Sequence, residues 1–218
     1  MSSLQLADDG ASADLRTFAS RARRLDAGAA LRLVAAGGVL AVYACALHGG
    51  GGPTVLGLRT HALAERADLD VTVPAAAVLD RLALKPAGDV PAVLSVPETS
   101  APQAAWAGVL PPRSGWSFEG LVSPDLLRAA ASAGIAEVAA GTPDVAGASA
   151  VARLRALVWG RALDGLTVPA GAAFAADAFG FLGGATSEGA DAITLHRAGP
   201  WWRLSTTRGH ILTRASLL

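Results

Sequence analysis

A histidine followed by four glycines, His48 to Gly52, is the string in this chain best suited to chemistry. In esterases of the α/β-hydrolase fold, an HGGG loop after a strand supplies backbone N–H groups that stabilise an oxyanion. That chemistry also needs a serine in a G-x-S-x-G turn, which the sequence lacks; the nearest string is ATSEG around Ser187. A triad would have to join Ser187, Asp191 and His210 without that turn. We therefore interpret the glycine string as a hairpin loop.

The same glycines do not match a phosphate-binding loop. No Lys-Ser/Thr pair follows them, and the next residues have the pattern of a strand rather than of an anion-binding helix. Metal binding is not indicated either, because the four histidines include no pair four residues apart. We expect no metal, no cofactor and no identifiable catalytic residue, and we leave open whether the chain is an enzyme.

Tryptophan and arginine side chains are the best candidates for a binding surface. Trp201 and Trp202 are consecutive, so in a strand their side chains point to opposite faces, and the exposed one would anchor a partner. Arg203 follows directly. Trp159 lies one helical turn after Arg155, where the two would form a cation–π stack. We take Trp159, Trp201, Trp202 and Arg203 as a candidate interface and expect a homo-oligomer.

The charge balance argues against a general attraction to nucleic acid or to an anionic membrane, since 18 basic side chains match 18 acidic ones. A polyanion would need a local patch. Arginines of two predicted helices are the candidate phosphate contacts: Arg16, Arg23, Arg24, Arg153 and Arg155. Such arginines more often form a solvated helix face, so nucleic acid is not the favoured partner.

Composition favours a cytoplasmic globular protein. The single cysteine, Cys45, cannot form an intrachain disulfide, which favours a reducing compartment. The first residues lack the basic and apolar regions of a signal peptide. The longest uncharged run, Leu33 to Leu47, is too short to span a bilayer and contains two consecutive glycines, so we expect no membrane association.

The elements that would position these residues suggest an α+β fold of two small halves. We expect a disordered N-terminus at 1–11, one half at 12–84, a proline-rich connection at 85–117 and a second half at 118–218. Each half should hold a short, mainly antiparallel sheet with two packed helices.

In the first half, we predict a helix with Ser12 as its N-cap and a hairpin that turns at Gly37-Gly38. A third strand should follow the glycine loop. The string TVPA at 72–75 should end a strand and begin a helix, because proline fits the first helical turn.

In the second half, Ser123 and Pro124 should begin a helix that stops at Gly134. A further helix is predicted over 148–163. A second TVPA string should lead into a helix so apolar that it must be buried. Three strands should follow within 193–214, with turns at Gly199-Pro200 and Arg208-Gly209.

The two TVPA strings and the order of helices and strands resemble the domain of the bacterial sliding clamp, the β subunit of DNA polymerase III, over residues 12–84 and 148–214. This resemblance implies helices that face DNA, yet Arg81 is the only basic residue of the two helices after TVPA. The segments FASRARRLDAGAALRL and GPWWRLSTTRGHILTR are also similar to uncharacterised conserved proteins of actinobacteria. That likeness implies a bacterial cytoplasmic setting and no particular activity.

The hypothesis that best fits these observations is a non-catalytic cytoplasmic binding or scaffolding protein that self-associates. No constellation of nucleophile, base and oxyanion donors emerges from the sequence. Two alternatives stay open. One is a clamp-like, DNA-associated protein, and the other is a small-molecule binder or enzyme with a pocket between the two halves.

Overall fold

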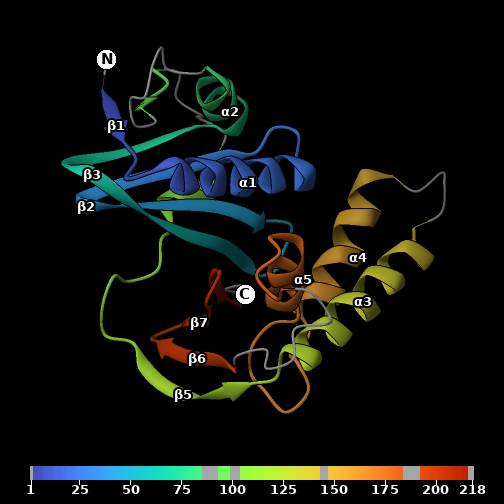
Figure 1. Cartoon of the computed structure of the whole chain (residues 1–218). Helices are drawn as coiled ribbons and strands as arrows, with labels where there is room; N and C mark the ends of the chain where they lie inside the picture. The colour runs from blue at the N-terminus through green and yellow to red at the C-terminus, as the bar shows by residue number, and fades with distance from the viewer. Residues whose placement is uncertain (1, 85–92, 99–103, 143–146, 184–191, 216–218) are drawn as a thin grey trace. The chain divides into compact units, whose positions relative to one another are not determined.

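A computed structural model describes residues 2–84, 93–98, 104–142, 147–183 and 192–215 (Figure 1). Its α-helices and antiparallel strands confirm the predicted α+β class. The chain forms two compact units, each with its own core. The first comprises residues 1–45 and 58–110, and the second comprises residues 46–57 and 111–218. The segment 46–57 thus belongs to the second unit, although it lies early in the sequence.

The first unit holds two α-helices, most of two long strands, and two short strands that pair with each other. Its elements in chain order are β1 (Ser3–Gln5), α1 (Asp9–Leu25), β2 (Ala30–Leu47), β3 (Thr54–Pro74), α2 (Ala75–Ala83), β4 (Val93–Ser95) and the 3-10 helix η1 (Ala105–Gly108). Helix α1 packs against α2. The apolar face of α1, which includes Leu15 and Phe18, is buried.

The N-terminus differs from the expected disordered segment. Ser3–Gln5 pairs with Val93–Ser95. We expected residues 93–95 in the proline-rich connection, but they belong to the first unit. Helix α1 begins earlier than predicted, because the carboxylate of Asp8 accepts a hydrogen bond from the N–H of Ala11 at 2.7 Å and caps the helix. Ser12, the predicted cap, is a buried residue inside the helix.

The predicted hairpin turn at Gly37-Gly38 is wrong. β2 continues through both glycines, and Gly37 takes a φ of 61° within the strand. The chain reverses instead at the glycine loop between β2 and β3, where Gly49, Gly50 and Gly51 all have positive φ. Three consecutive left-handed residues are accessible to glycine alone without strain, so this string makes the turn. The interpretation of residues 48–52 as a hairpin loop is confirmed.

The first TVPA string behaves as predicted: β3 ends at Pro74 and α2 begins at Ala75. The second stands before a helix but ends no strand. There, Ala162 forms an isolated bridge with Pro169, and the helix begins at Gly171. The two strings therefore share the helix start and differ in what precedes it.

The second unit combines four strands with three α-helices, which correspond to the three helices predicted from Ser123, over 148–163 and after the second TVPA string rather than to two per half. Its further elements are β5 (Ser117–Val122), α3 (Pro124–Ala140), α4 (Ala148–Gly160), α5 (Gly171–Ala178), β6 (Ile193–Ala198), β7 (Trp201–Thr206) and β8 (Gly209–Arg214). Sheet order is β2-β3-β8-β7-β6-β5, with β5 at one end. The turns at Gly199-Pro200 and before Gly209 separate β6, β7 and β8 as predicted.

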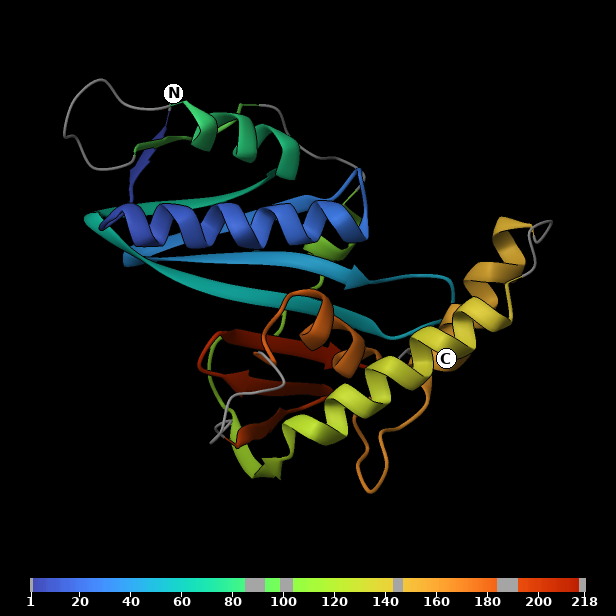
Figure 2. The same ribbon diagram turned by 45° about the vertical axis from the view of Figure 1, so that its right-hand side comes forward.

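Helix α3 begins as predicted but does not stop at Gly134. Ser123 accepts a hydrogen bond from the N–H of Asp125, Pro124 opens the first turn, and the helix continues to Ala140. Gly134 is buried inside it, and a Cβ there would lie 2.2 Å from Cζ3 of Trp159. The glycine therefore makes room for a tryptophan of α4. Figure 2 shows α3 and α4 side by side.

Helix α5 is buried as its composition predicted, packing against α3, α4 and β8. Phe179, which follows it, is fully buried and comes so close to Gly57 that a Cβ on that glycine would lie 2.6 Å from the ring. None of the described helices is both long enough and apolar enough to cross a bilayer.

Candidate ligand-binding cleft

A cleft of about 490 Å³ opens in the second unit between the glycine loop and one face of α4. Both walls belong to this unit, so the cleft is formed without the first one. The lining residues are Ala46, Leu47, His48, Gly49, Gly50, Gly52, Pro53, Ala148, Val151, Ala152, Arg155, Ala156 and Trp159. The lining is therefore mostly small and apolar, with few polar groups, as is usual for small-molecule sites.

The α4 wall is a single helical stripe. Its six lining residues follow one another at alternating intervals of three and one positions, which places them on the same face of the helix. The stripe has alanine at 148, 152 and 156, so the helix surface is shallow there and leaves space above it. Arg155 carries the only formal charge of the stripe.

The opposite wall is the turn of the β2–β3 hairpin. The N–H of Gly52 donates to the carbonyl of Gly49 at 3.1 Å, which closes the turn. A Cβ on Gly52 would lie 3.3 Å from Cα and Cβ of Ala156, so loop and helix approach closely at this point. At Gly49 and Gly50, by contrast, a Cβ would meet no atom within 4 Å. The loop thus contacts α4 at one end and leaves the cleft open at the other.

Trp159 lies at the buried end of the cleft. Its side chain is buried, and its ring stacks on Phe174 of α5 with 4.7 Å between centroids. The stack that we expected between Arg155 and Trp159 is replaced by this aromatic contact, although both residues line the cleft. The ring also packs closely against Gly134 of α3, so Trp159 contacts both neighbouring helices.

The charges of the lining favour an anion. Arg155 is exposed and the imidazole of His48 is held through Nδ1, which lies 3.1 Å from the hydroxyl oxygen of Thr54. No lining residue carries a carboxylate, a hydroxyl or a thiol. The cleft therefore offers a cation, and its lining side chains include neither a hydroxyl or thiol nucleophile nor a carboxylic acid that could act together with His48.

The structure places the predicted interface residues in different surroundings. Trp159 and Trp201 are buried, with exposures of 2% and 4%. Trp202 and Arg203 keep part of their surface exposed. Each tryptophan of the final strands lies under an arginine: the guanidinium of Arg214 is over Trp201, and that of Arg197 is over Trp202. Only Trp159 of this set lines the cleft.

The five candidate phosphate contacts are also dispersed. In the first unit, Arg16 donates to the carbonyl of Leu82, while Arg23 and Arg24 are exposed in the last turn of α1. On α4, Arg153 and Arg155 are both exposed, but only Arg155 lines the cleft. Two positions correspond to about 200° around a helix, which places these two arginines on opposite faces.

Two residues of the hydrolase alternative, Ser187 and Asp191, lie outside the described residues. Within the described ranges, no three His, Cys, Asp or Glu side chains gather to hold a metal ion. The cleft itself was missed by sequence reasoning. The spacing of small residues along 148–159 indicates the helical wall of the cleft. The loop that forms the other wall lies about a hundred residues earlier, so the sequence pattern alone does not connect the two.

Comparison with known families accounts for almost the entire chain. Residues 1–108 match a domain of unknown function, DUF8010, and residues 111–218 match another, DUF8185. The meeting point of the two matches agrees with the division into units near residue 110. No curated protein and no solved structure is significantly similar. The chain thus matches two uncharacterised domain families, DUF8010 followed by DUF8185, along nearly its whole length.

Proposed function

We propose that this chain is a non-catalytic binding protein whose second unit holds a small, largely apolar anion in the cleft. The observation that carries the proposal is the composition of the lining: an apolar helix stripe and a glycine loop around a single guanidinium, with no carboxylate. The apolar part of the ligand would lie along Ala152, Ala156 and Trp159. Its anionic group would be held by Arg155 at the open side.

The same composition supports binding rather than turnover. Catalysis by acyl or phosphoryl transfer requires a nucleophile, or a positioned water, with an acid–base partner. In the cleft, His48 supplies the only imidazole of the lining, and its Nδ1 is engaged with Thr54. Thr54 is itself buried, with an exposure of 6%, and is not a lining residue.

A titration with 8-anilinonaphthalene-1-sulfonate tests the proposal, because this compound joins apolar rings to one sulfonate. We expect saturable binding to the native protein. Arg155→Ala should weaken it by about tenfold through loss of the charge-assisted hydrogen bond. Arg153→Ala, on the opposite face of α4, is the matched control and should bind like the wild type. The measurement is dye fluorescence, checked by calorimetry for a stoichiometry of one.

A second pair of variants tests whether the dye occupies the cleft. Ala152→Phe places a ring inside the cleft and should abolish binding, whereas Ala150→Phe, at an exposed position outside the lining, should not. If the affinity for the dye is unchanged in both Arg155→Ala and Ala152→Phe, the proposed site is wrong. Circular dichroism of each variant separates loss of binding from loss of fold.

Self-association, a cytoplasmic setting and an actinobacterial origin stay predictions from the sequence. The clamp-like, DNA-associated alternative also stays a prediction. That alternative would require basic helix faces. Among the five arginines that we took as candidate phosphate contacts, Arg16 donates a hydrogen bond to the carbonyl of Leu82.

A further inference from the structure

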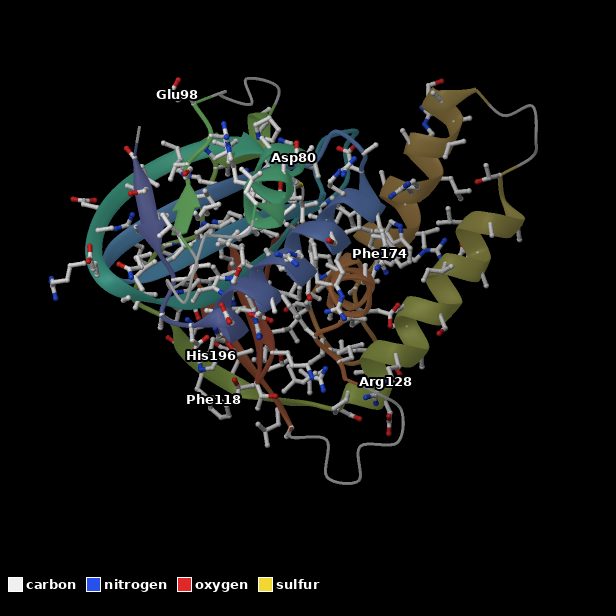
Figure 3. All side chains as sticks on the ribbon, turned by 45° about the horizontal axis from the view of Figure 1, so that its top comes forward. Asp80, Glu98, Phe118, Arg128, Phe174 and His196 are labelled. Atoms are coloured by element: carbon white, nitrogen blue, oxygen red, sulfur yellow. The ribbon has the colours of Figure 1, made fainter. Side chains whose placement is uncertain are left out.

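A second surface, on strands β5 to β7 of the second unit, gathers aromatic and basic side chains. Phe118 is paired with His196, and His196 is paired with Arg203, across adjacent antiparallel strands. Directly opposite residues share a face of the sheet, so these three form one cross-strand row. Figure 3 labels Phe118 and His196, whose rings meet edge to face with 5.7 Å between centroids.

An irregular register in β5 brings another apolar side chain to the same face. Leu121 is paired with Thr194, two residues from His196 on β6, so Thr194 and His196 point the same way. The register shifts after Phe118, and this shift lets Phe118 and Leu121 share a face although they are three residues apart. Both are largely exposed, at 61% and 64%.

The arginine of the row is held by a tryptophan. The guanidinium carbon of Arg203 lies 4.7 Å from the ring centroid of Trp116, and the indole N–H of Trp116 donates to the carbonyl of Pro112 at 3.0 Å. Nε of Arg203 has no hydrogen-bond partner among the described residues. Burial and the nearby Arg203 lower the pKa of His196, so this imidazole is neutral at physiological pH.

The charge of this part of the chain is strongly asymmetric. Residues 193–214 contain four arginines, two histidines and no aspartate or glutamate. The segment 111–122, which leads into and forms β5, adds Arg113 and Glu119. Five arginines therefore stand against one carboxylate in these two segments, whereas basic and acidic side chains are equal in number over the whole chain. Arg203 shares the face of Phe118 and His196, whereas Arg197, next to His196 on β6, points to the opposite face. A partner with a repeated negative charge would complement this excess of arginines.

We propose that the surface formed by Trp116, Phe118, His196 and Arg203 binds single-stranded nucleic acid. The exposed ring of Phe118 offers a stacking platform for a base, and Arg203 in the same cross-strand row would contact a phosphate. An acidic peptide would satisfy the charges but would leave the exposed ring of Phe118 without a stacking partner. The surface shares no residue with the cleft, so this site is independent of the proposed small ligand.

Fluorescence anisotropy with a labelled oligothymidine of about 12 nucleotides tests the site. We expect binding that weakens as salt rises from about 50 to 200 mM. Phe118→Ala should weaken binding by about tenfold with little change in its salt dependence. Arg203→Ala should lower the slope of log affinity against log salt by about one.

Ile135→Ala is the matched control for Phe118→Ala, because it removes an exposed apolar side chain from α3, away from the sheet. It should bind like the wild type. Poly-glutamate added as a competitor identifies the class of partner: it should displace the oligonucleotide poorly. Equal displacement by poly-glutamate, an unchanged affinity in Phe118→Ala, or no binding at low salt would each overturn the proposal.

Discussion

Gly134→Ala should destabilise the second unit by about 3 kcal/mol, although the same change in an exposed helix normally stabilises by up to about 1 kcal/mol. The added Cβ would lie 2.2 Å from Cζ3 and 2.5 Å from Cη2 of Trp159. That ring cannot withdraw easily, because Trp159 is buried and stacked on Phe174. Either α3 and α4 must separate or the tryptophan must leave its rotamer, and both disrupt close packing.

Thermal unfolding followed by circular dichroism measures the effect, with an expected fall in Tm of at least about 10 °C. Gly160→Ala in α4 is the matched control, because its Cβ would meet only Cδ of Pro53, at 3.9 Å. Its Tm should stay within about 3 °C of the wild type. Equal stability of the two variants would contradict the packing of Trp159 on α3.

A double variant isolates the contact. Trp159→Leu alone should destabilise by creating a cavity. Combined with Gly134→Ala, it should cost less than the sum of the two single changes, since the new methyl group enters the space that the indole leaves. If the change in unfolding free energy of the double variant equals the sum of the two single changes, residues 134 and 159 do not contact each other as the structure shows. Both single variants should also weaken binding of the naphthalene sulfonate, because Trp159 closes the buried end of the cleft.

Local signals in the sequence were enough where an element is determined by its own residues. Ser123 and Pro124 predicted the start of α3, and the turn residues after Ala198 and Thr206 predicted three separate strands. The apolar composition around α5 predicted its burial. These features depend on capping, turn conformation and hydrophobicity, which act over a few residues.

Glycines were misread where their role depends on a distant partner. Gly37 and Gly134 both look like chain breakers, yet Gly37 lies within a strand beneath the guanidinium of Arg66, and Gly134 lies within a helix against Trp159. Nothing local distinguishes a glycine that turns the chain from one that makes room for a neighbour. The cleft was hidden for the same reason, since its two walls meet only in the folded unit.

Protonation of His61 should make the first unit lose stability between about pH 6.5 and pH 4. His61 lies on β3 with an exposure of 4%, and its Nε2 has no hydrogen-bond partner among the described residues. Burial is the main cause that lowers the pKa of His61 to about 4; Asp14 opposes this shift and Arg59 adds to it. Nδ1 of His61 lies 3.5 Å from Oδ2 of Asp14, whose carboxylate also accepts a hydrogen bond from Arg59 at 2.8 Å.

The sign follows from proton linkage. Below pH 6.5 the unfolded chain binds a proton at His61 that the folded chain excludes until about pH 4. The neutral histidine therefore contributes its full stability above pH 6.5, and this contribution is lost as the pH falls through that window. A shift of this size corresponds to about 3 kcal/mol at the acid end. Other groups titrate in the same range, so the effect must be measured as a difference between variants.

Urea unfolding of wild type and His61→Leu from about pH 7 to pH 4 provides that difference. Leucine cannot bind the proton, so the variant should become more stable relative to wild type as the pH falls, by about 3 kcal/mol over the window. Thr213→Val is the control: Thr213 is equally buried and its Oγ1 has no partner in the described residues, but it does not titrate. Its free energy of unfolding should differ from that of wild type by a constant amount at every pH. A constant difference for His61→Leu as well would mean that His61 does not remain neutral in the folded protein.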